Sequence, residues 1–146
     1  MNGLIRNLEP AEILGEIIAV NRYLGGGLGD KRKIINVVLM GSGEPLDNYD
    51  NTVSFLRLVS MPSGINISQR NISLSTSGIV PKMFELANEN LSINLTVSLH
   101  SPFDDEREKI MPVAKAYKIS EILDACSNYF EKTRSEEHTS ELQSLG

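Results

Sequence analysis

The chain has 146 residues, 40% of them hydrophobic and 23% charged, which suits one domain with one core. Its formal net charge of −5 and pI of about 5.0 argue against a free-standing nucleic-acid-binding module held by charge alone. No apolar run reaches the roughly 18 residues of a membrane span and no secretory pattern is visible, so we expect a cytoplasmic protein with no membrane partner. The single cysteine, Cys126, excludes a disulfide framework and a multi-cysteine metal or cluster site built by this chain alone.

Helix and strand patterns alternate along the chain. Pro10, after Glu9, suits a first helical position, and the glycines at 25–27 end the apolar stripe that follows. The next patterns are a buried strand at 34–40, a helix at 47–61, a strand at 71–77, a helix at 81–90, a strand at 93–100 and a helix at 119–130. This order predicts an α/β fold with right-handed crossovers and a parallel sheet.

Two of the predicted strands carry one apolar and one polar face. Ile93, Leu95, Val97 and Leu99 alternate with Asn94, Thr96, Ser98 and His100, and Ile72 and Leu74 alternate with Asn71, Ser73, Ser75 and Ser77. Because side chains two apart share a face, crossover helices must bury the apolar faces and leave the polar ones toward solvent or a ligand. We therefore predict an open β/α barrel with a polar lumen. An antiparallel sheet with one solvated face gives the same alternation, but the intervening helices argue against it.

Small polar loops follow the three strands, at 41–45, 75–78 and 98–102. In β/α barrels the reactive groups gather at these strand ends. Pro45 favours an extended backbone at Glu44, which fixes the direction of the Glu44 carboxylate. A carboxylate, serine hydroxyls and the imidazole of His100 around one mouth would suit a zwitterionic or ribose-bearing ligand. Each loop alone is ordinary turn chemistry, and a single histidine is more often structural than catalytic.

Two other features have structural explanations. The glycine-rich run at 25–29 follows a helix rather than a strand, so it is interpreted as a helix end and not as a phosphate-binding loop. Cys126 falls on the apolar stripe of its helix, so we expect it in the core.

Four segments carry a family resemblance: RNLEPAEILGEI, NVVLMGSGEPLDNYDN, NISLSTSGIVPKMFELA and LTVSLHSPFDDEREKIMPV. From about residue 3 to residue 133 the chain resembles radical S-adenosylmethionine (SAM) enzymes, in particular the RlmN type, which methylate C2 of adenine in 23S rRNA and tRNA. The resemblance implies a partial parallel (βα) barrel, truncated at both ends, that holds SAM and a [4Fe-4S] cluster. In that family SAM is both the methyl donor and the source of a 5′-deoxyadenosyl radical.

The same resemblance implies which residues of this chain hold SAM. Gly43 and Glu44 would meet the methionyl amino group, and Ser75 would hold the polar part of the molecule. Ser98, Leu99 and His100 would contact SAM from the next strand.

The chain also departs from the family pattern. The CxxxCxxC motif that ligates the cluster and the cysteine that carries the methyl group are both absent. We therefore expect an internal fragment with a partial radical SAM core at 1–133, monomeric and inactive by itself, whose sheet has two unpaired, aggregation-prone edges. Residues 134–146 are expected to be a disordered tail, and the string RSEEHTSELQS resembles a translated sequencing adapter.

Two alternative functions stay open. One is a cluster-free module that binds SAM or a nucleotide and acts by binding alone. The other is a fragment of an adenine-C8 methyltransferase from the same superfamily, although GEPL at 43–46 favours C2.

Overall fold

A computed structural model describes residues 4–41 and 43–134. Of the expected tail at 134–146, only Arg134 is described, as the last residue of a helix, so the expectation of disorder falls outside the described residues. No helix within 4–41 and 43–134 is both long and apolar enough to cross a membrane.

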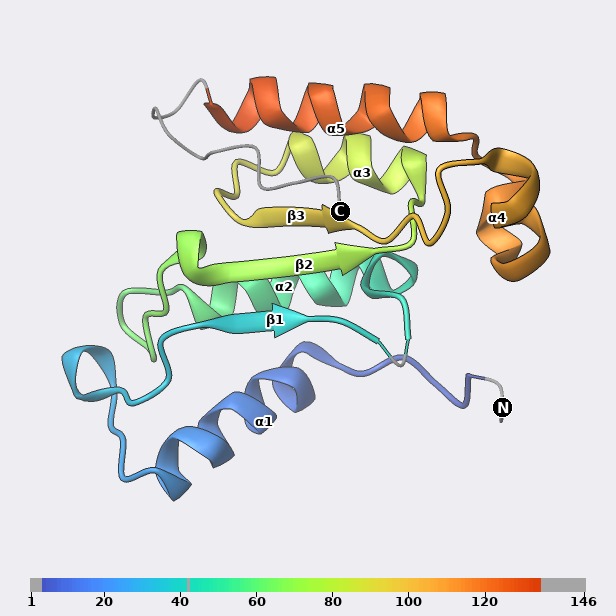
Figure 1. The fold of residues 1–146 in the computed structure, drawn as a ribbon. Helices are drawn as coiled ribbons and strands as arrows, with labels where there is room; N and C mark the ends of the chain where they lie inside the picture. Colours follow the sequence, from blue (N-terminus) through green and yellow to red (C-terminus); the bar gives the residue numbers. More distant parts are fainter. Residues whose placement is uncertain (1–3, 42, 135–146) are drawn as a thin grey trace.

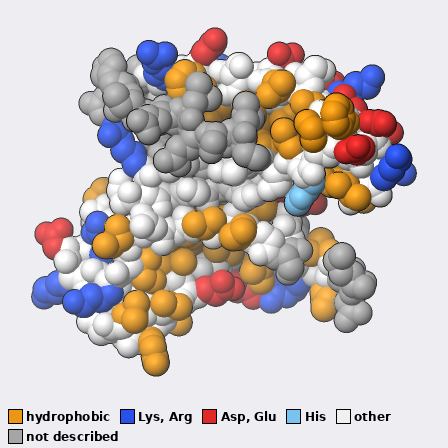
Figure 2. All heavy atoms as spheres, viewed as in Figure 1, with side chains coloured by type: hydrophobic (Ala, Val, Ile, Leu, Met, Phe, Trp, Pro, Cys, Tyr) orange, Lys and Arg blue, Asp and Glu red, His pale blue; other side chains and the backbone are white. Residues whose placement is uncertain are grey.

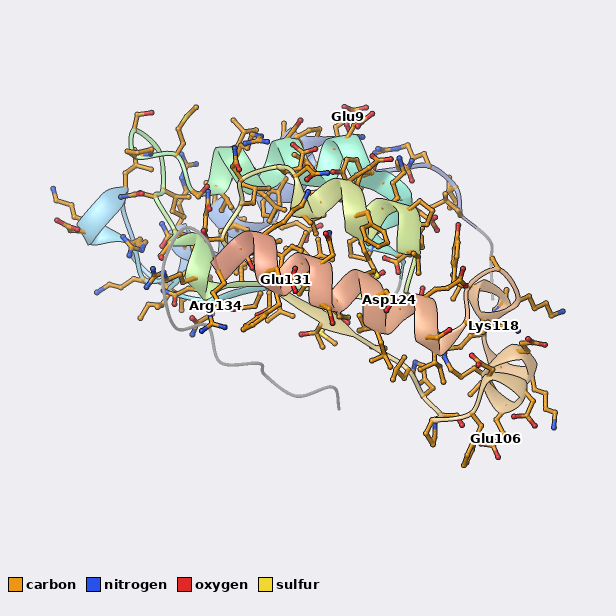
Figure 3. The ribbon with its side chains drawn as sticks, turned by 90° about the horizontal axis from the view of Figure 1, so that it is seen from above. Glu9, Glu106, Lys118, Asp124, Glu131 and Arg134 are labelled. Atoms are coloured by element: carbon orange, nitrogen blue, oxygen red, sulfur yellow. The ribbon has the colours of Figure 1, made fainter. Side chains whose placement is uncertain are left out.

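The elements follow the predicted alternation (Figure 1). The helices are α1 (Pro10–Tyr23), α2 (Tyr49–Val59), α3 (Val80–Ala87), α4 (Asp104–Ile110) and α5 (Ile119–Arg134). The strands are β1 (Val37–Leu39), β2 (Ile72–Thr76) and β3 (Asn94–Val97). Both strand pairs are parallel and the sheet order is β1-β2-β3, which confirms the expected parallel α/β arrangement. Helix α2 lies behind β1 and β2, and α5 packs beside α3 (Figures 1 and 3).

Helix α1 begins and ends where its sequence predicts. Pro10 is its first residue, and Glu9 and Glu12 form a capping box in which the Glu12 carboxylate accepts from the Glu9 amide at 2.8 Å. After the helix, Gly25 adopts a φ of 78°, a conformation that glycine takes without strain.

The sheet has one covered face and one open face, as the alternation predicts. On β2, Ile72 and Leu74 are fully buried on the covered face, whereas Ser73 and Ser75 are half-buried on the open face. The register pairs Ser75 with Thr96, so the polar side chains of both strands lie side by side. Figure 2 looks onto the open face, whose middle is mostly neither hydrophobic nor charged.

The prediction of a fully buried first strand is wrong. Val37 is buried, but Val38 is 57% exposed and Met40 is 67% exposed. Both point to the open face, which no helix among the described residues covers. The apolar run at 34–40 therefore belongs to a strand that is buried on one face only.

The segment after β3 also differs from expectation. Helix α4 has no apolar stripe and was not predicted; its signal is charge, with Asp104, Asp105 and Glu106 in the first turn and Arg107 and Lys109 in the last. Helix α5 runs to Arg134, four residues past the predicted end.

The packing of α5 partly matches the prediction. The helix buries Ile122, Ala125 and Tyr129, whereas Leu123, an apolar residue of the same helix, is 39% exposed. Cys126 packs against the core as expected, and burial raises the pKa of its thiol. The face of α5 that points away from α3 is charged, and Asp124 and Glu131 on it are both exposed (Figure 3).

Candidate functional site

The loops that follow β1, β2 and β3 lie at one edge of the molecule. The three strand arrows point the same way in Figure 1, so the carboxyl ends of the strands are neighbours. This edge is where the sequence places the candidate ligand-binding residues.

The carboxylate of Glu44 joins the β1 loop to the end of β2. Its Oε1 accepts three hydrogen bonds, from Thr76 Oγ1 at 2.6 Å, from the Ser77 amide at 2.6 Å and from Ser77 Oγ at 2.8 Å. Its Oε2 accepts one, from the Leu46 amide at 3.0 Å. The backbone of Glu44 is extended, as the following Pro45 predicts. Each carboxylate oxygen has two lone pairs, so Oε1, which shares them among three donors, is saturated. Oε2 has a single donor and keeps one acceptor position for a cationic group.

Ser75 and Ser98 form a second pair on the open face. Their hydroxyl oxygens lie 3.4 Å apart, and the Ser98 amide donates to the Thr76 carbonyl at 2.9 Å, which extends the β2–β3 ladder by one step. The two hydroxyls therefore present adjacent donors and acceptors beside the strand ends.

Gly43, Leu99 and His100 complete the predicted set. Nothing lies within 4 Å of a Cβ built at Gly43, so this position borders open space. His100 is exposed and has a φ of 63°, a left-handed conformation that is uncommon for a residue other than glycine and recurs at functional sites. Leu99 is half-buried, and its backbone carbonyl accepts a hydrogen bond from Arg107 Nε at 3.0 Å. No hydrogen bond among the described residues links His100 to Glu44 or to the serine pair.

A hollow of about 380 Å³ opens beside Glu44 and Ser77. Residues 110–113, which are apolar, also line it, and Asp47 adds a second acidic group to its lining. Acidic groups and apolar side chains in one hollow suit a ligand that combines a positive charge with an apolar or flat part.

Thr76 and Ser77 were not predicted as site residues. Thr76 shares the covered face with Leu74, so its position in the alternation indicates core, yet its buried hydroxyl donates to Glu44. The signal that could have identified both residues is the run of hydroxyl side chains at 75–77, since buried hydroxyls need partners.

The residues that the structure describes do not fit an iron–sulfur cluster. They contain no group of three or more His, Cys, Asp or Glu side chains arranged to hold a metal ion. The sequence has one cysteine, and Cys126 lies on α5, packed against the core rather than at the strand ends.

Comparisons with known proteins bear on the fold and on the family of the chain. The sequence profile of the Radical SAM superfamily matches residues 2–139. A crystal structure of a radical SAM methyltransferase from Sphaerobacter thermophilus superposes with a TM-score of 0.81 at 38% identity, covering 90% of this chain and 38% of that one. The fold is therefore a partial radical SAM barrel, as expected from the sequence.

The curated relatives carry RNA methyltransferase names. A protein of Clostridioides difficile (strain 630) named as a dual-specificity RNA methyltransferase, RlmN, is 56% identical over 133 residues, which cover 91% of this chain and 37% of the relative. A protein with the same name from Lachnoclostridium phytofermentans is 51% identical over 133 residues, 91% of this chain and 36% of the relative. The chain thus spans little more than a third of the length of these relatives.

Proposed function

The chain belongs to the radical SAM superfamily, and from that premise we propose that it forms the SAM-holding part of an RNA methyltransferase. The reaction we propose for the whole enzyme is methylation of C2 of adenine in 23S rRNA and tRNA, in the cytoplasm and by a monomer. We also propose that residues 1–133 correspond to the core of that enzyme. The dual-specificity RNA methyltransferase names of the relatives support this proposal.

The observation that carries the proposal is the Glu44 carboxylate, anchored at the carboxyl end of β2 with one acceptor position left on Oε2. The amino group of SAM is a cation that this position can accept, and a hydrogen bond between charged groups is among the stronger ones. Gly43 leaves space for the approach of the ligand. The paired hydroxyls of Ser75 and Ser98 and the exposed His100 offer partners for the rest of the polar part of SAM.

SAM, when bound, supplies the methyl group and a cleavable sulfonium, and the residues of this chain bind and orient it. The superfamily also implies a [4Fe-4S] cluster. One cysteine cannot supply the thiolates that such a cluster needs, so no step of the reaction is assigned to this chain through a cluster.

A SAM titration of the isotope-labelled chain, followed by NMR, tests the site. We expect amide signals to shift at 43–46, 75–78 and 98–101, and Glu44→Gln to raise the dissociation constant at least about tenfold. Glutamine can keep an oxygen at the Oε1 position, so the variant should fold, but it places an amide nitrogen where Oε2 would meet a cation. Glu16→Gln, an exposed change on α1, is the matched control. Equal affinity of Glu44→Gln and the unmodified chain would contradict the proposal.

The RNA reaction needs a separate test. The complete gene product, reconstituted anaerobically with iron and sulfide, should methylate ribosomal RNA at adenine C2, while this chain alone should not. Methylation mapped to adenine C8 instead would contradict the proposal and identify the enzyme as an adenine-C8 methyltransferase.

A binding-only module is the second candidate, favoured by the single cysteine. The SAM affinity of this chain, measured by calorimetry, distinguishes a binding-only module from a part of a larger enzyme. Micromolar SAM affinity of this chain would favour the module, whereas binding visible only at millimolar SAM by NMR would favour the enzyme part.

A further inference from the structure

Helix α4 is attached to the rest of the molecule by an arginine. Arg107 is 0% exposed and is the only buried residue of the helix, although neither apolar packing nor an ion pair requires it there. Every other residue of α4 is exposed except the half-buried Asp104. Burying a guanidinium is costly unless its donors are satisfied, so its contacts should explain its presence.

The guanidinium of Arg107 donates to three backbone carbonyls. Nε donates to the Leu99 carbonyl at 3.0 Å, one terminal nitrogen to the Ser77 carbonyl at 3.4 Å and the other to the Tyr117 carbonyl at 3.5 Å. Within 4–41 and 43–134, no carboxylate pairs with it. The guanidinium is a planar fork, so its three nitrogens point in different directions and one side chain reaches all three acceptors. The donors of a lysine ammonium all lie on one nitrogen, which cannot reach three separate carbonyls.

Two of the three carbonyls belong to the loops of the candidate site. Ser77 follows β2 and donates its amide and hydroxyl to Glu44. Leu99 follows β3 and directly precedes His100, whose backbone is left-handed. Arg107 therefore links the loops that follow β2 and β3 through their backbone carbonyls, and the same loops carry candidate ligand-binding groups.

We propose that Arg107 is a positioning residue for SAM: it sets the spacing between the Glu44–Ser77 pair and the Ser98–His100 loop. This inference rests on the proposed function for the identity of the ligand. The local part, the spacing of the two loops, does not depend on that identity.

The test compares Arg107→Met and Arg107→Lys with the unmodified chain. Lys109→Met is the matched control, because it removes a cation from the exposed side of the same helix. SAM affinity is measured by NMR titration, and amide hydrogen exchange is followed at 77–79 and 99–103 and, for comparison, at Ile72–Leu74 of β2 and along α5.

Arg107→Met should weaken SAM binding at least about tenfold and accelerate exchange in the two loops, with exchange in β2 and α5 unchanged. Arg107→Lys, which keeps the charge, should fold and yet bind SAM more weakly than the unmodified chain, because one ammonium cannot serve both loops. Lys109→Met should change neither readout.

Two results would overturn the inference. One is unchanged loop exchange and unchanged SAM affinity in Arg107→Lys and Arg107→Met. The other is faster exchange throughout the sheet in both variants, which would make Arg107 a residue of general stability. If the unmodified chain shows no shifts with SAM, the proposed function fails, and the exchange pattern alone then decides whether Arg107 positions the loops.

Discussion

The covered and open faces of the same three strands differ in what their side chains do. On the covered face Ile72 and Leu74 are fully buried beneath helices, where their contribution is packing. On the open face Ser73, Ser75 and Ser98 are half-buried and leave hydroxyls available to a ligand. The comparison teaches that in a short parallel sheet adjacent residues can be assigned to stability and to binding by their position in the alternation alone. Thr76 is the exception, because it is buried on the covered face and still reaches Glu44.

The largest expected difference between the faces is at neighbouring residues of β2. Leu74→Ala should lower the free energy of unfolding by about 2–5 kcal/mol, since it leaves a cavity under the helices. Ser73→Ala should change it by no more than about 0.5 kcal/mol. Urea unfolding followed by circular dichroism measures both free energies. Similar losses of unfolding free energy in the two variants would contradict the distinction between the covered and the open face.

The turn after β2, where the two faces end, is expected to tolerate little change. Gly78 has a φ of 105°, and a Cβ there would lie 2.7 Å from Ile122 Cδ1. Gly78→Ala should therefore cost about 1–3 kcal/mol of unfolding free energy. Gly15→Ala is the control, because nothing lies within 4 Å of its built Cβ and alanine should stabilise the interior of α1 by about 0.5–1 kcal/mol. Thermal melting of the two variants should shift in opposite directions.

A smaller effect is expected where α5 meets the start of β3. The Tyr129 hydroxyl donates to the Ile93 carbonyl at 2.6 Å in a buried contact. Tyr129→Phe removes one hydrogen bond and should cost about 1 kcal/mol. Tyr23→Phe, at a residue that is 90% exposed, should leave the urea midpoint unchanged. A loss of stability in Tyr129→Phe but not in Tyr23→Phe would support the placement of α5 against the covered face of the sheet.

The smallest effect on stability is expected on the open face of β1. Val38 is 57% exposed on an edge strand, so Val38→Lys should change the unfolding free energy by no more than about 0.5 kcal/mol. It should, however, reduce aggregation, because charge on an edge strand opposes pairing with other chains. Light scattering during concentration measures this, and Ser54→Lys on α2 adds the same charge away from the open face. A monodisperse unmodified chain would contradict the expected edge hazard.

Local patterns could predict most of the fold. The stripe after Pro10 and the alternation from Ile93 to His100 correspond to α1 and to β3 with its loop, because burial of one face imposes a period on the sequence. Helix α4 could not be found this way, since its one buried residue is Arg107. The exposure of Val38 could not be predicted either, because an apolar run does not indicate which face of the strand is covered.

The candidate site could be predicted at the level of loops but not of contacts. The positions of Glu44 and His100 after their strands follow from the alternation of elements. The bond from Thr76 to Glu44 and the reach of Arg107 to Ser77 depend on how three loops meet in space, which no local pattern encodes.

The agreement between sheet order and chain order has a kinetic consequence. Among the described strands, β2 pairs with β1 and β3 pairs with β2, through crossovers that contain α2 and α3 respectively. Both pairings join strands that are consecutive among the described residues, so the sequence distance between paired strands stays low for a parallel sheet. Folding can therefore proceed in step with synthesis: β1, α2 and β2 can assemble while β3 is still being made.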